Sequence, residues 1–203
     1  MVKEFLKDIP GELHETKWVN FEHNRNHALD LARKKSDYIL IIDADEELVY
    51  EEGFDLPSLD KDFYYITSKY GGSSYVRNQL IKSDLDWKWK GVVHEVVFTP
   101  QARSHTTLSK MHNFIRPAEG SRSSDEQRYL KDAYALEEAL KKDPNNKRDT
   151  FYLAQSYRDA GEPELAIKNY ERRIALGGWD QEIFWSKYQI AIMQKSLKKD
   201  PEL

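Results

Sequence analysis

Apolar and polar positions change their period about halfway along the chain. In the first half, apolar residues form short runs or alternate with polar ones, as they do in β-strands. The longest run, 38–42 (YILII), is expected to be a buried strand because apolar side chains occupy both of its faces. We therefore predict strands over 38–42, 63–69, 74–82, 91–99 and 106–114, and one helix over 26–35.

The second half follows helical spacing throughout. Apolar residues recur every three or four positions, and proline and glycine lie where helices are expected to begin and end. The pattern predicts four helices, over 124–142, 151–160, 162–176 and 180–195. Residues 117–124, rich in small and polar side chains, separate the two halves. We therefore expect two domains, a mixed one over 1–120 and a helical one over 121–203.

A short motif recurs within the helical half. Residues 152–155 (YLAQ) are followed 36 positions later by 188–191 (YQIA). With the glycine turn and the proline at the next helix start, this spacing resembles the tetratricopeptide repeat, whose period is about 34 residues. So few repeats seldom fold alone, so we expect the helices to lean on the first half. Two roles stay open for them, a packing cap and a docking groove, and the tyrosines here and Trp179 are predicted to be core.

Composition narrows the class of protein. The 203 residues include no cysteine, which excludes disulfide frameworks, thiolate zinc sites and cysteine nucleophiles. No run approaches the roughly 18 apolar residues of a membrane span. A net charge of -4 argues against a broad nucleic-acid-binding surface. We therefore expect a soluble, cytoplasmic protein with no transmembrane segment and no nucleic-acid partner.

The candidate chemistry lies where the apolar run ends. Residues 41–46 (IIDADE) place Asp43 and Asp45 directly after the predicted strand, and ligands of α/β sheets bind at the carboxyl ends of strands. Carboxylate oxygens are hard ligands, suited to Mg²⁺ or Mn²⁺ held against phosphate. A solvated acidic loop is the competing interpretation, because six carboxylates occur within ten residues here: Asp43, Asp45, Glu46, Glu47, Glu51 and Glu52.

Two flanking motifs extend this pattern. Residues 18–29 (WVNFEHNRNHAL) precede the apolar run, and residues 87–95 (WKWKGVVHE) follow it. The order of these motifs around 41–46 resembles the family-2 glycosyltransferases of GT-A fold, in particular those with C-terminal tetratricopeptide repeats. The likeness covers about 17–194. It implies an α/β fold, with a reduced, Rossmann-like GT-A mixed sheet followed by an all-α array of helical hairpins.

The resemblance also implies a role for each matched residue. Asp43 and Asp45 would bind the metal and the donor, and His112 would complete a metal shell that its imidazole makes more suitable for Mn²⁺ than for Mg²⁺. Arg25 would pair with the diphosphate of the donor, a UDP-sugar. Glu95 would be the catalytic base that takes a proton from the acceptor, with inversion at the sugar carbon. Purely structural roles are the alternative for Arg25, Glu95 and His112.

The usual N-terminal nucleotide-binding βαβ segment of the family is not matched, because only residues 1–17 precede the first motif. We therefore expect a reduced nucleotide pocket, a pocket completed by another chain, or a truncated protein. We also expect an exposed sheet edge at 38–42 or its neighbour, which would pair with a partner chain or with a second copy. Of Trp87 and Trp89, one is expected to form a wall of the acceptor site and the other to be core.

Three classes of function stay open. The first is a metal-dependent glycosyltransferase that moves a sugar from a nucleoside-diphosphate sugar to an acceptor glycan, protein or lipid-linked sugar. The second is a degenerate glycosyltransferase-like scaffold whose helices bind a protein or peptide. A metal-dependent phosphohydrolase is the third and weakest, because ligands for a second metal are missing. Metal-dependent binding of UDP separates the first class from the second.

Overall fold

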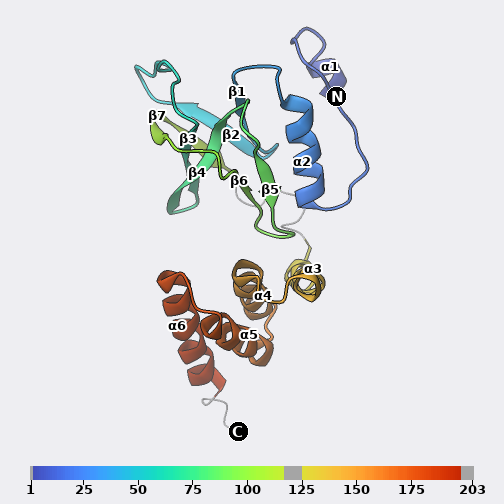
Figure 1. The fold of residues 1–203 in the computed structure, drawn as a ribbon, viewed down its shortest axis with the longest axis vertical. Helices are drawn as coiled ribbons and strands as arrows, with labels where there is room; N and C mark the ends of the chain where they lie inside the picture. Colours follow the sequence, from blue (N-terminus) through green and yellow to red (C-terminus); the bar gives the residue numbers. More distant parts are fainter. Residues whose placement is uncertain (1, 117–124, 198–203) are drawn as a thin grey trace.

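The protein is a mixed α/β structure. The computed structural model describes residues 2–116 and 125–197. The strands and α2 form one body, and the last four helices lie together against its lower end (Figure 1). The elements, in chain order, are α1 (Val2–Phe5), α2 (Phe21–Ala32), β1 (Tyr38–Leu40), β2 (Glu46–Tyr50), β3 (Phe63–Tyr70), β4 (Ser73–Lys82), β5 (Lys88–Lys90), β6 (Val96–Phe98), β7 (His105–Ile115), α3 (Arg128–Lys142), α4 (Lys147–Asp159), α5 (Pro163–Ala175) and α6 (Asp180–Leu197).

Five strands form one sheet in the order β1-β4-β3-β7-β2. β3 and β7 run parallel, and the other neighbouring pairs are antiparallel, so the sheet is mixed. β5 and β6 pair separately as a two-stranded ribbon. β1 is an edge strand, and Leu40 and Ile42 are 42% and 43% exposed. The predicted strand is present over 38–40 with Ile39 in the core, but the expectation that both of its faces are buried is wrong. The expected exposed edge is confirmed.

Buried side chains gather in three clusters. The first lies beneath α2 and consists of Leu29, Ile39, Ile81, Trp87 and Trp89. The second comes from the sheet alone and consists of Tyr64, Ile66, Leu80, Leu108 and Met111. The third is the core of the helices, and it includes one residue from the first half of the chain, Val93. The two halves are therefore packed together.

The helices α3 to α6 follow one another, each packed against the next (Figure 1). The side chain of Asn146 accepts a hydrogen bond from the Asp149 N–H, so α4 begins about one turn earlier than predicted. Tyr157 and Tyr170 are buried, as predicted. Tyr134, Trp179 and Tyr188 are 58%, 60% and 49% exposed, so the prediction that they are core is wrong. Among the described elements no helix follows α6, so none covers the side of α6 that faces away from α5.

Other expectations need correction. The predicted strand over 91–99 is limited to β6, because Gly91 and His94 have positive φ values of 108° and 54° that bend the chain. β2 lies within the acidic stretch and was not predicted. The predicted domain boundary at 117–124 lies outside the described residues.

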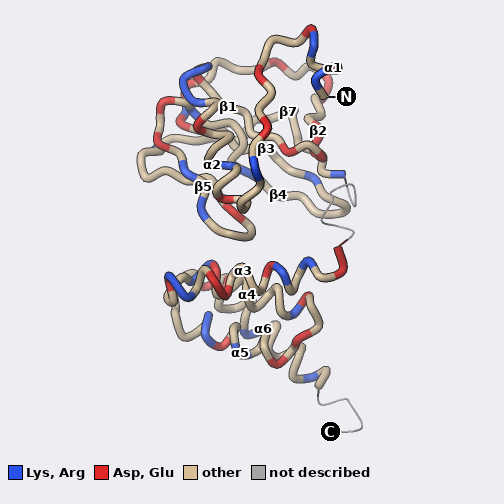
Figure 2. Tube along the Cα trace, turned by 90° about the vertical axis from the view of Figure 1, so that its right-hand side faces the viewer, with Lys and Arg blue, Asp and Glu red and all other residues tan. Residues whose placement is uncertain are grey.

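Two global features bear on partners. Basic and acidic residues are interspersed along both parts of the chain (Figure 2). Of the helices within residues 2–116 and 125–197, none has the length and apolar character needed to span a bilayer.

Candidate functional site

The acidic stretch after β1 folds into a closed turn. The N–H of Glu46 donates to the carbonyl of Asp43 at 3.0 Å, and the N–H of Asp43 donates to Glu46 Oε2 at 3.1 Å. The side chain of Glu46 is only 2% exposed. It also accepts hydrogen bonds from Arg77 and, at 3.3 Å, from Gln79. A buried carboxylate therefore holds the turn, so Glu46 is not part of a solvated loop.

Arg25 joins two candidate residues that are far apart in sequence. It lies in the second turn of α2, a helix that begins after Asn20, whose side chain accepts the His23 N–H. Arg25 Nε donates to Glu95 Oε1 at 2.5 Å, and Arg25 Nη2 donates to Asp43 Oδ2 at 2.9 Å. The structure thus brings Arg25, Asp43 and Glu95 together.

Electrostatics favour the charged forms of Asp43 and Arg25. Burial alone would raise the pKa of Asp43, but the hydrogen bond and charge of Arg25, with Arg77 at 3.7 Å, outweigh burial and lower that pKa. For Arg25, burial opposes the charged form, but Asp43 and Glu95 outweigh it and raise the pKa of the guanidinium. Asp43 is therefore ionised and Arg25 protonated at neutral pH. Their side chains are 31% and 23% exposed, and that of Glu95 is 11% exposed.

A bent segment between β5 and β6 presents Glu95. Its first residue, Gly91, has a φ of 108°, and its N–H donates to Glu22 Oε2 at 3.1 Å. Val93, in the middle, is 5% exposed and is buried among the helices. His94 has a φ of 54°, a left-handed conformation that few non-glycine residues adopt. The position of Glu95 therefore depends on contacts on both sides of this segment.

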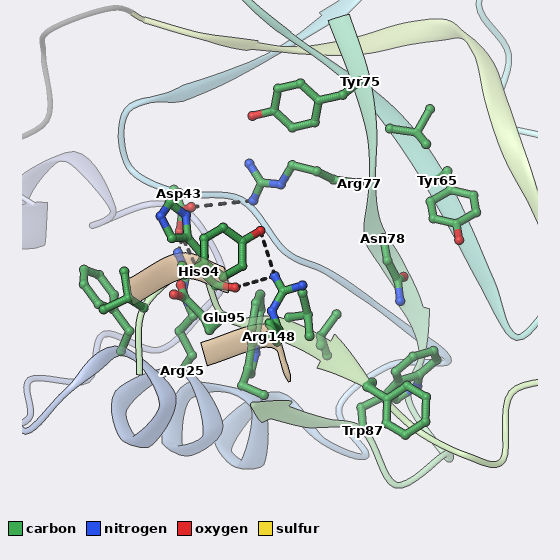
Figure 3. Close-up of a pocket in the computed structure, with 18 of the residues that line it drawn as sticks. Arg25, Asp43, Tyr65, Tyr75, Arg77, Asn78, Trp87, His94, Glu95 and Arg148 are labelled. Atoms are coloured by element: carbon green, nitrogen blue, oxygen red, sulfur yellow. Dashed lines mark hydrogen bonds and ion pairs between the residues drawn. The ribbon is translucent and has the colours of Figure 1, made fainter. Parts of the chain in front are cut away.

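A cavity of about 1080 Å³ lies between the sheet and the helices, and the cluster forms one end of it (Figure 3). Arg77 and Arg148 approach the same end as Asp43 and Glu95. The other end is aromatic, with ring centroids 4.9–5.7 Å apart, and consists of Phe63, Tyr65, Trp87 and His105. Such a cavity suits a ligand that carries a charged group at one end and a ring at the other.

Asp45 and His112 lie outside this cluster. Asp45 lines a neighbouring cavity of about 700 Å³, which Asp43 also lines. His112 lies on β7, where its Nδ1 is buried without a hydrogen-bond partner and lies 3.8 Å from Glu51. Among the residues that the structure describes, no group of three or more histidine, aspartate and glutamate side chains is arranged to hold a metal ion. The expected shell of Asp43, Asp45 and His112 is not assembled there.

Trp87 and Trp89 do not differ in the way expected, because both are core residues and both line a cavity. Both are buried, at 2% and 8% exposed, and both line the larger cavity. The guanidinium of Arg25 lies over the ring of Trp89, 4.8 Å from its centroid, which orients Arg25 toward its two carboxylates. Each tryptophan is therefore core and wall together.

Sequence reasoning missed three residues of the site. Arg77 is not predicted, because β4 carries several polar residues and one more charged position does not stand out in it. Arg148 lies in the first turn of α4, where the helix dipole disfavours a positive charge, which indicates a partner outside the helix. Tyr152 carried no such signal, because a tyrosine at a helical spacing is ordinarily core.

The comparisons with known proteins add no relative. No protein-family model matches the chain, and no curated protein matches it. Functional inference therefore depends on the geometry of the site and on the motif resemblance.

Proposed function

We propose that the chain carries the reaction site of a glycosyltransferase that resembles family 2 of the GT-A fold. It would transfer a sugar from a nucleoside-diphosphate sugar, such as a UDP-sugar, to an acceptor glycan or protein. One observation carries this proposal: Arg25, Asp43 and Glu95, each matched to a different motif, meet at one end of a single cavity. A Rossmann-like origin of the sheet and a tetratricopeptide-like array of α3–α6 belong to the same proposal.

The residues of the cluster have complementary tasks in this reaction. The guanidinium of Arg25 exchanges its carboxylate partners for diphosphate oxygens, which it binds through paired N–H groups. Glu95 accepts the proton of the acceptor hydroxyl while that oxygen bonds to the anomeric carbon. The bond from this carbon to the diphosphate breaks at the same time. Attack from the opposite face inverts the configuration of the carbon.

A divalent cation stays part of the proposal, at a site with fewer protein ligands than the sequence predicted. Mg²⁺ and similar cations are commonly held by one or two carboxylates together with substrate phosphates, without a full protein shell. Asp43 and Asp45, which line one cavity, are the candidate ligands for Mn²⁺ or Mg²⁺. When bound, the cation would neutralise charge on the departing diphosphate. His112 has no place in this reduced site.

A binding scaffold is the second candidate, favoured by a different observation. Arg25 is already paired with both Asp43 and Glu95. α6 leaves an aromatic surface exposed, in which Phe184 and Tyr188 are 68% and 49% exposed. A catalytically inactive chain would keep the ion pairs for stability and bind a protein or peptide through the helices.

Calorimetric titration with UDP, with and without Mn²⁺, tests the first candidate. We expect binding that requires Mn²⁺ and that Asp45→Ala abolishes. Asp84→Ala is the matched control, because that side chain is 67% exposed and lies outside both cavities. Binding should be followed by a screen of UDP-sugars for hydrolysis and transfer.

Either result of the titration decides between the two candidates. Binding that needs both the metal and Asp45 supports the enzyme. No binding under any condition contradicts a self-sufficient donor site in this chain and favours the scaffold. Equal loss of binding in Asp45→Ala and Asp84→Ala would show that acidity in general is responsible, which also contradicts the proposed site.

A further inference from the structure

The segment that carries Glu95 is held from the helical side by consecutive residues. Val93 inserts its side chain into the helical core, where Ala133 and Leu136 are fully buried. The next residue, His94, stacks its ring on Tyr152 of α4, with centroids 4.2 Å apart and an angle of 23° between the planes. The residue after that is Glu95, whose carboxylate reaches Arg25. The helices therefore contact both residues that directly precede the candidate base.

α4 also holds the backbone of this segment. Arg148 Nη2 donates to the carbonyl of His94 at 2.7 Å. Its guanidinium lies over the Tyr152 ring, 4.8 Å from the centroid, so Tyr152 contacts both His94 and Arg148. The left-handed conformation of His94 is intrinsically unfavourable for a residue with a Cβ. Contacts from outside the segment must therefore stabilise it.

We propose that α4 positions Glu95. Arg148 and Tyr152 hold His94 in its left-handed conformation, and this conformation directs the following side chain to Arg25. Both are positioning residues, and the helical half has a role beyond capping the sheet or docking an acceptor. The role of Glu95 as a catalytic base rests on the proposed function. The structural coupling between α4 and the Arg25–Glu95 pair does not.

The coupling can be measured without any turnover. In the ¹⁵N-labelled full-length chain, the Nε–H of Arg25 donates to Glu95 and is expected to exchange slowly with water. Arg25→Lys assigns its signal. Tyr152→Ala should accelerate this exchange roughly three- to tenfold, the effect expected from loss of one stacked pair. Tyr152→Phe keeps the ring and loses only the long hydrogen bond from Arg148, at 3.4 Å, so it should leave the exchange nearly unchanged.

Tyr134→Ala is the matched control, because Tyr134 lies on neighbouring α3 and is 58% exposed. It should leave the Arg25 signal unchanged. If Tyr152→Ala folds but does not accelerate exchange, the proposal is overturned. It is equally overturned if Tyr152→Phe or Tyr134→Ala accelerates exchange as much, because the cause would then be general loosening.

Turnover, once found, separates this inference from the proposed function. Glu95→Gln should lower kcat by about 10²- to 10⁴-fold, the usual contribution of a general base. Tyr152→Ala should lower kcat by roughly three- to tenfold at unchanged KM, and Tyr152→Phe should restore it. Full activity in Glu95→Gln contradicts the base but leaves the coupling intact. A raised KM at unchanged kcat in Tyr152→Ala would mean that Tyr152 contacts substrate, which overturns the positioning role.

Discussion

At the scale of single residues, Asp43 has two structural roles, one for its backbone and one for its side chain. Its backbone closes the turn with Glu46, and its carboxylate pairs with Arg25 and Arg77. The resemblance implies a role for Asp43 and for Arg25, but the ion pair between them is a structural finding. The sequence could not identify Arg77 as a partner of Asp43, because nothing in a single sequence relates two residues 34 positions apart.

The ion pairs of Asp43 make stability depend on pH. Because the pKa of Asp43 is lowered in the folded protein, its pairs stabilise the fold above its ordinary pKa of about 3.9, and this contribution is lost as the pH falls through the lowered value. We expect Asp43→Asn to reduce the free energy of unfolding by about 1–2 kcal/mol at pH 7. The difference from the unmodified chain should vanish well below pH 4.

Thermal or urea unfolding at a series of pH values checks this expectation. Asp84→Asn, at a 67% exposed position, is the control and should show no pH-dependent difference. A constant deficit of Asp43→Asn at all pH values would contradict the ion-pair explanation and point to the turn instead.

At the scale of elements, the sequence predicts helices well because their signals are local. The cap at Asn146 and the proline in the first turn of α5 both lie next to the helix that they start. The connection between α5 and α6 is different, because a buried ion pair secures it. Arg173 is 1% exposed and donates to Glu182 at 2.9 Å and to the Gly177 carbonyl at 2.8 Å.

Removal of one partner from this pair should be costly. Arg173→Met leaves Glu182 buried at 12% exposure without its counter-charge, so we expect a loss of about 3–5 kcal/mol in the free energy of unfolding. Arg172→Met changes the adjacent, exposed arginine and is the matched control. Chemical denaturation measures both. Similar losses in the two variants would show that the pair does not secure the junction of α5 and α6.

At the scale of the whole molecule, the edge strand β1 is the feature with the clearest consequence. Its outer side is unpaired in the described sheet, and Leu40 and Ile42 are exposed. Charged residues protect the other edge, where Glu47 pairs with Arg116. An unprotected apolar edge is a template for another strand.

We therefore expect concentration-dependent self-association through β1. Leu40→Lys should weaken it at least tenfold, because a charge on the edge opposes strand pairing. Leu165→Lys, at a 40% exposed position on α5, is the control and should leave association unchanged. Sedimentation equilibrium measures the constants. A chain that stays monomeric at all accessible concentrations would contradict the expectation.

The sequence by itself determined the mixed α/β class, the four C-terminal helices, the β3–β4 hairpin with its Gly-Gly turn, and the motifs that carry Arg25, Asp43 and Glu95. These features depend on periodicity, caps and turns, which act over a few residues. Only the tertiary structure decided that β1 is an edge, that the Glu46 side chain is buried, that Asp43, Asp45 and His112 form no metal-binding group among the described residues, and that α4 holds the segment before Glu95. Each of these depends on contacts between residues distant in sequence. Hydrophobic periodicity is a local property and does not specify which distant segments come into contact.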